Sequence, residues 1–197
     1  MPRIPPHWRS IGLLVLVLAM GSLRAVPAFE GQPKGPHIVM IIRHAEKPDE
    51  IDGKQDPNLS PRGVERADAL AKVIPERFHK PDFLIAAGKS KNSDRSAETI
   101  TPLAKALHKK VESKFKDDDF ARVAQAVLTD PKYAGKIVLI SWHHGNIPEL
   151  ARALGVKDAP PKWKSKAYDR VWEITYENGA ATWKDLPQKA LSGDSEK

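Results

Sequence analysis

The stretch His37-Ile-Val-Met-Ile-Ile-Arg-His-Ala-Glu-Lys47 decides the fold of this 197-residue chain. Residues 38–42 form an apolar run typical of a buried strand, and the run ends abruptly at Arg43 and His44. In open parallel sheets the ligand crevice lies beyond the carboxyl ends of the strands. We therefore expect this Arg-His pair to face a binding site. An imidazole can attack phosphorus directly, and a guanidinium can hold phosphoryl oxygens through two hydrogen bonds.

A second apolar run, Lys136-Ile-Val-Leu-Ile-Ser-Trp142, ends in His143-His144-Gly145-Asn146 before a predicted helix. Pro148 suits the first turn of that helix, because no backbone N–H is needed there. A strand, a tight turn with glycine and a helix N-terminus favour an anion, since free N–H groups and the helix dipole attract negative charge. One of the two histidines can therefore join His44, and the alternative is an exposed His-His turn.

A third element lies between these two in the sequence. The short apolar run 82–87 leads through the polar segment 88–94 to Arg95, near the start of a predicted helix that continues to Leu107. An ordinary surface arginine is the alternative interpretation of Arg95. The combination favours a site, because three strand ends in turn deliver Arg-His, Arg and His-Gly-Asn to one edge of a sheet.

Apolar runs alternate with helical segments along the chain, which predicts an α/β fold with a mostly parallel sheet. Near the carboxyl end, two strand-like runs flank Asn178-Gly179, which readily takes the positive φ angles of a tight hairpin turn. We therefore expect a three-layer α/β/α sandwich closed by an antiparallel edge hairpin. The strands are predicted at 37–42, 82–87, 136–142, 170–176 and 180–183, and the helices at 61–75, 95–107, 117–129 and 147–154.

From about residue 38 to residue 183, the chain resembles the histidine phosphatase superfamily, which includes the phosphoglycerate mutase-like phosphatases. The signature Arg-His-Gly of that superfamily resembles Arg43-His44-Ala45, and its Leu-Ser/Thr-x-x-Gly segment resembles Leu59-Ser-Pro-Arg-Gly63. Its second arginine motif is similar to Arg95-Ser-Ala-Glu-Thr99, and its second histidine is similar to the one in His144-Gly145-Asn146. The resemblance rests on four motifs that occur in the expected order.

The resemblance implies a phosphatase that needs neither metal nor cofactor and acts on a small phosphorylated anion. The phosphoryl group would pass to His44, and water would then hydrolyse the phosphohistidine. The same alignment places His144, rather than His143, in the pocket. The catalytic residues so implied are Arg43, His44, Arg95 and His144, and we assign Lys47 and Asn146 to substrate binding.

The leaving alkoxide needs a proton, so the site should include an acid. Relatives place this acid in a region that holds several carboxylates in the present chain. All of them remain candidates at this point: Glu112, Asp117, Asp118 and Asp119.

Some positions depart from the superfamily pattern. Ala45 replaces the usual glycine, and the segment 88–91 replaces a Ser-Pro before the second arginine. Lys47 and Glu50 stand where mutases carry a hydroxyl residue and an asparagine, which favours hydrolysis over mutase activity. Ala45 and the unplaced acid also leave an alternative open, a catalytically weak protein of the same fold that binds phosphate or a phosphosugar.

A metal-dependent hydrolase is the other alternative function. It would use the histidine side chains, and its metal site would be expected to add carboxylates at helical spacing, as in His-Glu-x-x-His. No such motif occurs in the sequence, which disfavours a metal site built from His37, His44, His143 and His144.

The N-terminal residues 1–28 have the pattern of a secretory signal peptide. Arg3 and Arg9 precede the apolar stretch 11–23, and Val26-Pro27-Ala28 suits a small-residue cleavage site. We therefore expect an exported protein, periplasmic or secreted, and the alternative is an uncleaved membrane anchor. The chain has no cysteine, so disulfides cannot stabilise it after export.

Composition indicates one catalytic domain, at residues 29–187, because 197 residues with 41% hydrophobic content suit a single core. The polar tail 188–197 is predicted to be disordered. Loss of residues 1–28 would lower the formal net charge from +7 to +4. This mild positive charge suits an anionic substrate, and without a dense basic stripe we expect no nucleic-acid binding.

Overall fold

The computed structural model describes residues 35–195, so the predicted signal segment lies outside the described residues and stays a prediction. In this part of the chain no helix is long and apolar enough to cross a membrane. The elements, in chain order, are β1 (Ile38–Arg43), α1 (Pro61–Arg77), β2 (Phe83–Ala87), α2 (Arg95–Ala106), β3 (Val111–Phe115), the 3-10 turn η1 (Asp117–Asp119), α3 (Phe120–Thr129), the 3-10 turn η2 (Pro131–Tyr133), β4 (Ile137–Trp142), α4 (Ile147–Ala153), β5 (Arg170–Glu177) and β6 (Ala180–Pro187).

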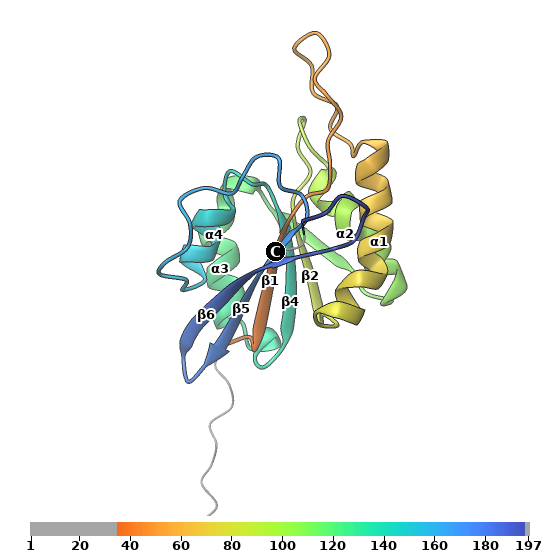
Figure 1. Cartoon of the computed structure of the whole chain (residues 1–197). Coiled ribbons are helices and arrows are strands. Elements are labelled where there is room, and N and C mark those ends of the chain that lie inside the picture. The colour runs from red at the N-terminus through yellow and green to blue at the C-terminus, as the bar shows by residue number, and fades with distance from the viewer. Residues whose placement is uncertain (1–34, 196–197) are drawn as a thin grey trace, which may run out of the picture. The chain divides into compact units, whose positions relative to one another are not determined.

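The strands form one sheet in the order β3-β2-β4-β1-β5-β6 (Figure 1). The first four strands in that order are parallel, β5 pairs antiparallel to β1, and β6 pairs antiparallel to β5. The hairpin turns at Asn178 and Gly179, whose φ angles are 51° and 79°. These findings confirm the predicted α/β fold with its antiparallel edge hairpin.

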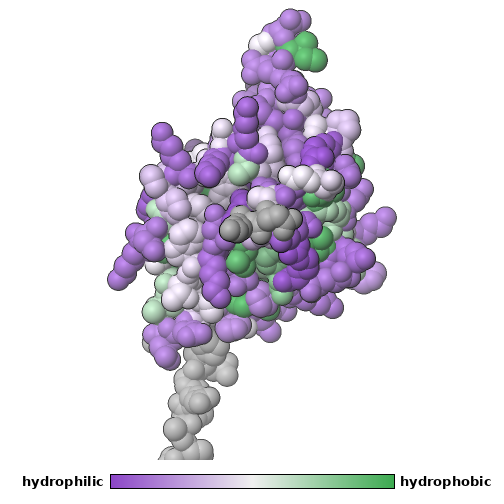
Figure 2. All heavy atoms as spheres, in the orientation of Figure 1, coloured by the Kyte–Doolittle hydropathy of each residue, from purple (hydrophilic) through white to green (hydrophobic). Residues whose placement is uncertain are grey.

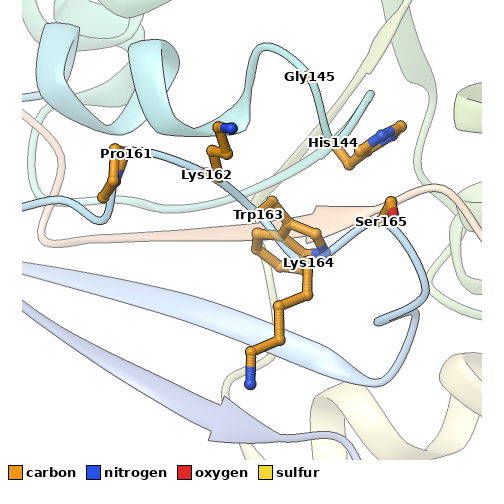
Figure 3. A pocket seen from close by; sticks show the side chains of 7 residues that line it. All are labelled: His144, Gly145, Pro161, Lys162, Trp163, Lys164 and Ser165. Atoms are coloured by element: carbon orange, nitrogen blue, oxygen red, sulfur yellow. The ribbon is translucent and has the colours of Figure 1, made fainter.

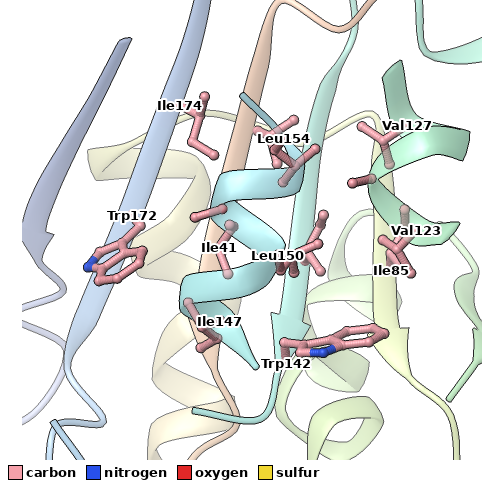
Figure 4. Close-up of a cluster of buried hydrophobic side chains, with 14 of the residues drawn as sticks. Ile41, Ile85, Val123, Val127, Trp142, Ile147, Leu150, Leu154, Trp172 and Ile174 are labelled. Carbon is pink, nitrogen blue, oxygen red and sulfur yellow. The ribbon is translucent and has the colours of Figure 1, made fainter. Parts of the chain in front are cut away.

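Helices cover both faces of the sheet, and β1 contributes to both cores. Val39 and Ile41 pack with side chains of α3 and α4, a cluster shown in Figure 4. Met40 and Ile42 pack with side chains of α1 and α2 on the opposite face. Because both faces of β1 are buried, its sequence is continuously apolar instead of alternating.

The adjacent strands β1 and β4 lead into helices on opposite faces of the sheet. The chain passes from β1 to α1 on one face, whereas β4 leads to α4 on the other. The two strands end level with each other, since Arg43 pairs with Trp142. In open α/β sheets a crevice forms where neighbouring connections diverge in this way. The residues that follow β1 and β4 therefore lie at this crevice.

The start of α1 fixes the chain that follows β1. Ser60 caps the helix by accepting a hydrogen bond from the Gly63 amide at 3.1 Å, and the Ser60 amide donates to the Glu46 carbonyl at 2.9 Å. A Cβ at Gly63 would lie 2.3 Å from the same Glu46 oxygen. Only glycine permits so close an approach, which explains this part of the sequence motif.

Two elements differ from the sequence prediction between residues 110 and 130. The strand β3 was not predicted, because Val111-Glu-Ser-Lys-Phe115 carries polar residues on a half-exposed edge strand, where they discourage pairing with other chains. The helix predicted at 117–129 begins with the 3-10 turn η1, and α3 proper starts at Phe120.

The segment 188–195 is packed, which corrects the expectation of a disordered tail. Arg66 of α1 is buried and forms ion pairs with Glu46 and Asp194, both at 2.8 Å. The side-chain oxygen of Gln188, also buried, accepts a further hydrogen bond from Arg66 at 3.0 Å. A buried guanidinium needs such partners, and the polar tail supplies two of the three.

Candidate active site

Arg43 is the last residue of β1 and is 1% exposed. Its guanidinium carbon lies 3.8 Å from the centre of the Tyr168 ring, and Nη2 donates to the Tyr168 hydroxyl at 3.1 Å. Nη1 donates to the carbonyl of Ser165. Both partners belong to the α4–β5 segment, residues 154–169, so Arg43 holds this segment against the end of the sheet.

His44 is buried in the form that a nucleophile requires. Its Nδ1 lies 2.7 Å from the carbonyl oxygen of Ala45, which can only accept, so Nδ1 carries the proton. Burial lowers the pKa of His44 to about 2, despite the opposing effect of the Ala45 carbonyl. The ring is therefore neutral, and Nε2 keeps its lone pair.

Thr99, on α2, links the two halves of the site. Its buried hydroxyl accepts from the Ala45 amide at 2.8 Å and donates to the Arg95 carbonyl at 2.7 Å. The position of Ala45 is thereby tied to α2. Since the Ala45 carbonyl orients His44, Thr99 also contributes to the orientation of the imidazole.

Arg95, at the start of α2, is 6% exposed and donates from Nη1 to the Asp56 carbonyl at 2.5 Å. The buried Nε atoms of Arg43 and Arg95 have no hydrogen-bond partner, and within residues 35–195 neither guanidinium forms an ion pair with a carboxylate. Burial lowers the pKa of both side chains, which nevertheless stay charged. This arrangement favours an anionic ligand.

The two histidines after β4 lie in different environments. The His143 ring packs edge-on against His44, with 5.1 Å between ring centres, and its pKa is lowered to about 4 by burial and then by Arg95. His144 instead lines a cavity of about 470 Å³ with Gly145 and residues 161–165 (Figure 3). The sequence resemblance placed only His144 in the pocket, whereas the structure places both histidines at the site, with His143 against His44.

The predicted substrate-binding residues lie at the rim of the site. Lys47 is exposed and donates a hydrogen bond to Gln55. The pKa of His144 is lowered mainly by burial, next by the charge of Arg43 and then by the charge of Lys47. Asn146 donates from Nδ2 to the Asp117 carbonyl at 3.1 Å. Lys47 is thus close enough to His144 to affect a ligand there, and Asn146 holds Asp117 in place.

Asp117 differs from the other candidate acids. One of its carboxylate oxygens is buried without a partner, and burial raises its pKa to about 6. Glu112 accepts from Lys132 and Tyr133, Asp119 accepts from the Lys116 amide and Arg122, and Asp118 is exposed. Asp117 therefore has the pKa that a proton donor needs near neutral pH.

Tyr168 is a site residue that sequence analysis missed. Besides its contacts with Arg43, its ring centre lies 6.1 Å from that of His44. It belongs to an irregular segment before β5 and to no recognised motif, so no sequence signal could have identified it. Among residues 35–195, no group of three or more His, Cys, Asp or Glu side chains could hold a metal ion.

Comparison with known proteins identifies the fold. No protein-family model and no curated protein sequence matches the chain. Among solved structures, the mycobacterial glucosyl-3-phosphoglycerate phosphatase has a TM-score of 0.55 at 15% identity over 79% of this chain and 100% of its own. The protein histidine phosphatase SixA complexed with tungstate has a TM-score of 0.55 at 15% identity, over 77% of this chain and 97% of its own. A phosphoserine phosphatase mutant from Entamoeba histolytica, in complex with phosphoserine, has a TM-score of 0.50 at 14% identity, over 78% of this chain and 98% of its own.

These likenesses establish that the chain has the fold seen in structures of the histidine phosphatase superfamily, as the sequence motifs predict. At 14–15% sequence identity, these likenesses establish the fold but do not identify the substrate.

The protonation state of His44 and His143 can be measured. Since burial lowers their pKa values to about 2 and about 4, we expect both rings to be neutral at pH 5, with the His44 proton on Nδ1. Nitrogen-15 NMR of histidine-labelled protein, assigned with His44→Ala and His143→Ala variants, distinguishes the tautomers. A His44 resonance that titrates near the ordinary pKa of about 6.5 would contradict the geometry described above.

Proposed function

We propose that the chain is a metal-independent phosphomonoesterase that acts through a phosphohistidine intermediate on His44. The observation that carries this proposal is the neutral, buried His44 beside two buried guanidinium groups that lack carboxylate partners. A nucleophile with a free lone pair and two cations for phosphoryl oxygens are the parts that phosphoryl transfer requires. The names of the structural neighbours, which are phosphatases, support the same class of reaction.

In the first step, Nε2 of His44 attacks phosphorus while the bond between phosphorus and the leaving oxygen breaks. Arg43 and Arg95 stabilise the non-bridging oxygens, to which their buried Nε groups can donate. The imidazole becomes positively charged when it is phosphorylated. The Ala45 carbonyl, which accepts from Nδ1, stabilises that charge.

In the second step, water attacks phosphorus and the bond to Nε2 breaks. His44 returns to its neutral form and inorganic phosphate leaves. We assign the proton transfers to Asp117, which gives a proton to the leaving alkoxide in the first step and takes one from water in the second. Its raised pKa suits both directions of transfer.

The first test is turnover of p-nitrophenyl phosphate by the purified chain. His44→Ala should lower kcat by at least about four orders of magnitude, because no other group takes over as nucleophile. Arg95→Ala should lower kcat by about a hundredfold to a thousandfold through loss of one charge-assisted donor.

The matched control is Arg122→Ala, since the Arg122 side chain is 71% exposed and, in the described part of the chain, pairs only with Asp119. It should leave turnover unchanged. Wild-type turnover by a folded His44→Ala protein would refute the proposal. Saturable binding of phosphate by a wild-type chain without any turnover would favour the binding protein instead.

The second test concerns Asp117 and uses the chemistry of the leaving group. An acid must be protonated to act, so kcat/KM for an alkyl phosphate should be highest below pH 6 and fall as pH rises through about 6. Asp117→Asn should lower the rate for the alkyl phosphate by about a hundredfold or more and abolish this fall. With p-nitrophenyl phosphate the loss in kcat/KM should be small, because kcat/KM reports the steps up to release of p-nitrophenolate, which leaves without a proton.

Asp118→Asn is the control for this test, because Asp118 is adjacent in sequence but exposed. It should preserve the rate at low pH and the fall itself, which should move to slightly lower pH because the Asp118 charge contributes to the raised pKa of Asp117. Equal losses for the two substrates in Asp117→Asn would show that Asp117 does not act as the acid.

A further inference from the structure

The cavity beside His144 is large enough for more than a phosphoryl group. Its volume is about 470 Å³, within the range of roughly 300–1,000 Å³ that small-molecule sites occupy. It shares two residues with the phosphoryl site, because His144 lines it and Ser165, whose carbonyl binds Arg43, lines it as well. A phosphomonoester with its phosphorus at His44 can therefore extend into this cavity with its leaving group.

The wall of the cavity opposite His144 is the α4–β5 segment, and this segment is firmly anchored. The Trp163 indole donates to the Ala167 carbonyl at 2.8 Å and packs on Trp172, with ring centres 4.9 Å apart. Trp163 is only 5% exposed, so its ring belongs to the core. The lysines on either side of Trp163 are exposed and extend from a fixed backbone.

Lys162 is the cationic group on the His144 side of this wall. Figure 3 shows Lys162 and His144 below the turn at Gly145, whereas the Lys164 side chain extends away from them. Within residues 35–195, Lys162 forms no hydrogen bond and no ion pair. No carboxylate lines the cavity, so no residue of the cavity wall neutralises the positive charge of Lys162.

We propose that the cavity binds the leaving group of the substrate and that Lys162 selects a leaving group with a second negative charge, a carboxylate or a second phosphate. This proposal rests on the proposed phosphatase function and specifies its substrate class. A neutral leaving group would leave the Lys162 ammonium in water with no interaction to gain. An anionic one forms a charge-assisted hydrogen bond with it.

The test compares two esters that differ only at the far end of the leaving group. These are 3-phosphoglycerate, which ends in a carboxylate, and glycerol 3-phosphate, which ends in a hydroxymethyl group. The purified full chain should show a kcat/KM for 3-phosphoglycerate that is higher by about twofold to fivefold, the range expected for one solvent-exposed charge pair. Lys162→Met should remove most of this preference, and Lys162→Glu should reverse it.

Lys157→Met is the matched control, since Lys157 is an exposed lysine of the same segment that does not line the cavity. It should preserve the preference. Equal kcat/KM values for the two esters in the wild-type chain, or a preference that survives Lys162→Glu, would overturn the leaving-group site while leaving the phosphatase function intact. Failure to hydrolyse these esters and p-nitrophenyl phosphate would overturn both proposals.

Discussion

Two buried guanidinium groups that have no carboxylate partner within residues 35–195 are the constraint on which the site depends. A buried charge is unfavourable unless its donors are satisfied, and Arg43 is only partly satisfied by the Tyr168 ring, its hydroxyl and one carbonyl. In the proposed reaction, a phosphoryl group supplies the missing negative charge. Burial, together with the same positive field, keeps His44 neutral, so one arrangement provides both an anion-binding site and the unprotonated imidazole that the proposed reaction needs.

The fold brings these groups together through its topology. Arg43 ends β1 and His44 follows it, His143 and His144 follow the adjacent β4, and Arg95 begins α2. Because the helices after β1 and β4 cover opposite faces of the sheet, no helix fills the crevice between the two strand ends. The buried strands keep the backbone rigid at this point, which holds the proposed catalytic side chains in place.

The sequence predicts those parts of the site that directly follow apolar runs. Arg43 and His44 could be located because a run of five apolar residues places them at a strand end. Tyr168 could not, since it lies in an irregular segment 125 residues from Arg43 and reaches the site only through tertiary packing. Burial of Arg66 by the tail is also invisible in a helical pattern, because arginine is ordinarily a surface residue.

The most direct measurement of the central claim is the capture of the phosphorylated enzyme. The wild-type chain is mixed with phosphorus-32-labelled p-nitrophenyl phosphate and quenched within one turnover, and the labelled peptide is identified. The account predicts label on Nε2 of His44, stable in alkali and lost in acid, and none in His44→Ala. Full turnover with the label on another residue, or with no labelled protein at any quench time, would contradict it.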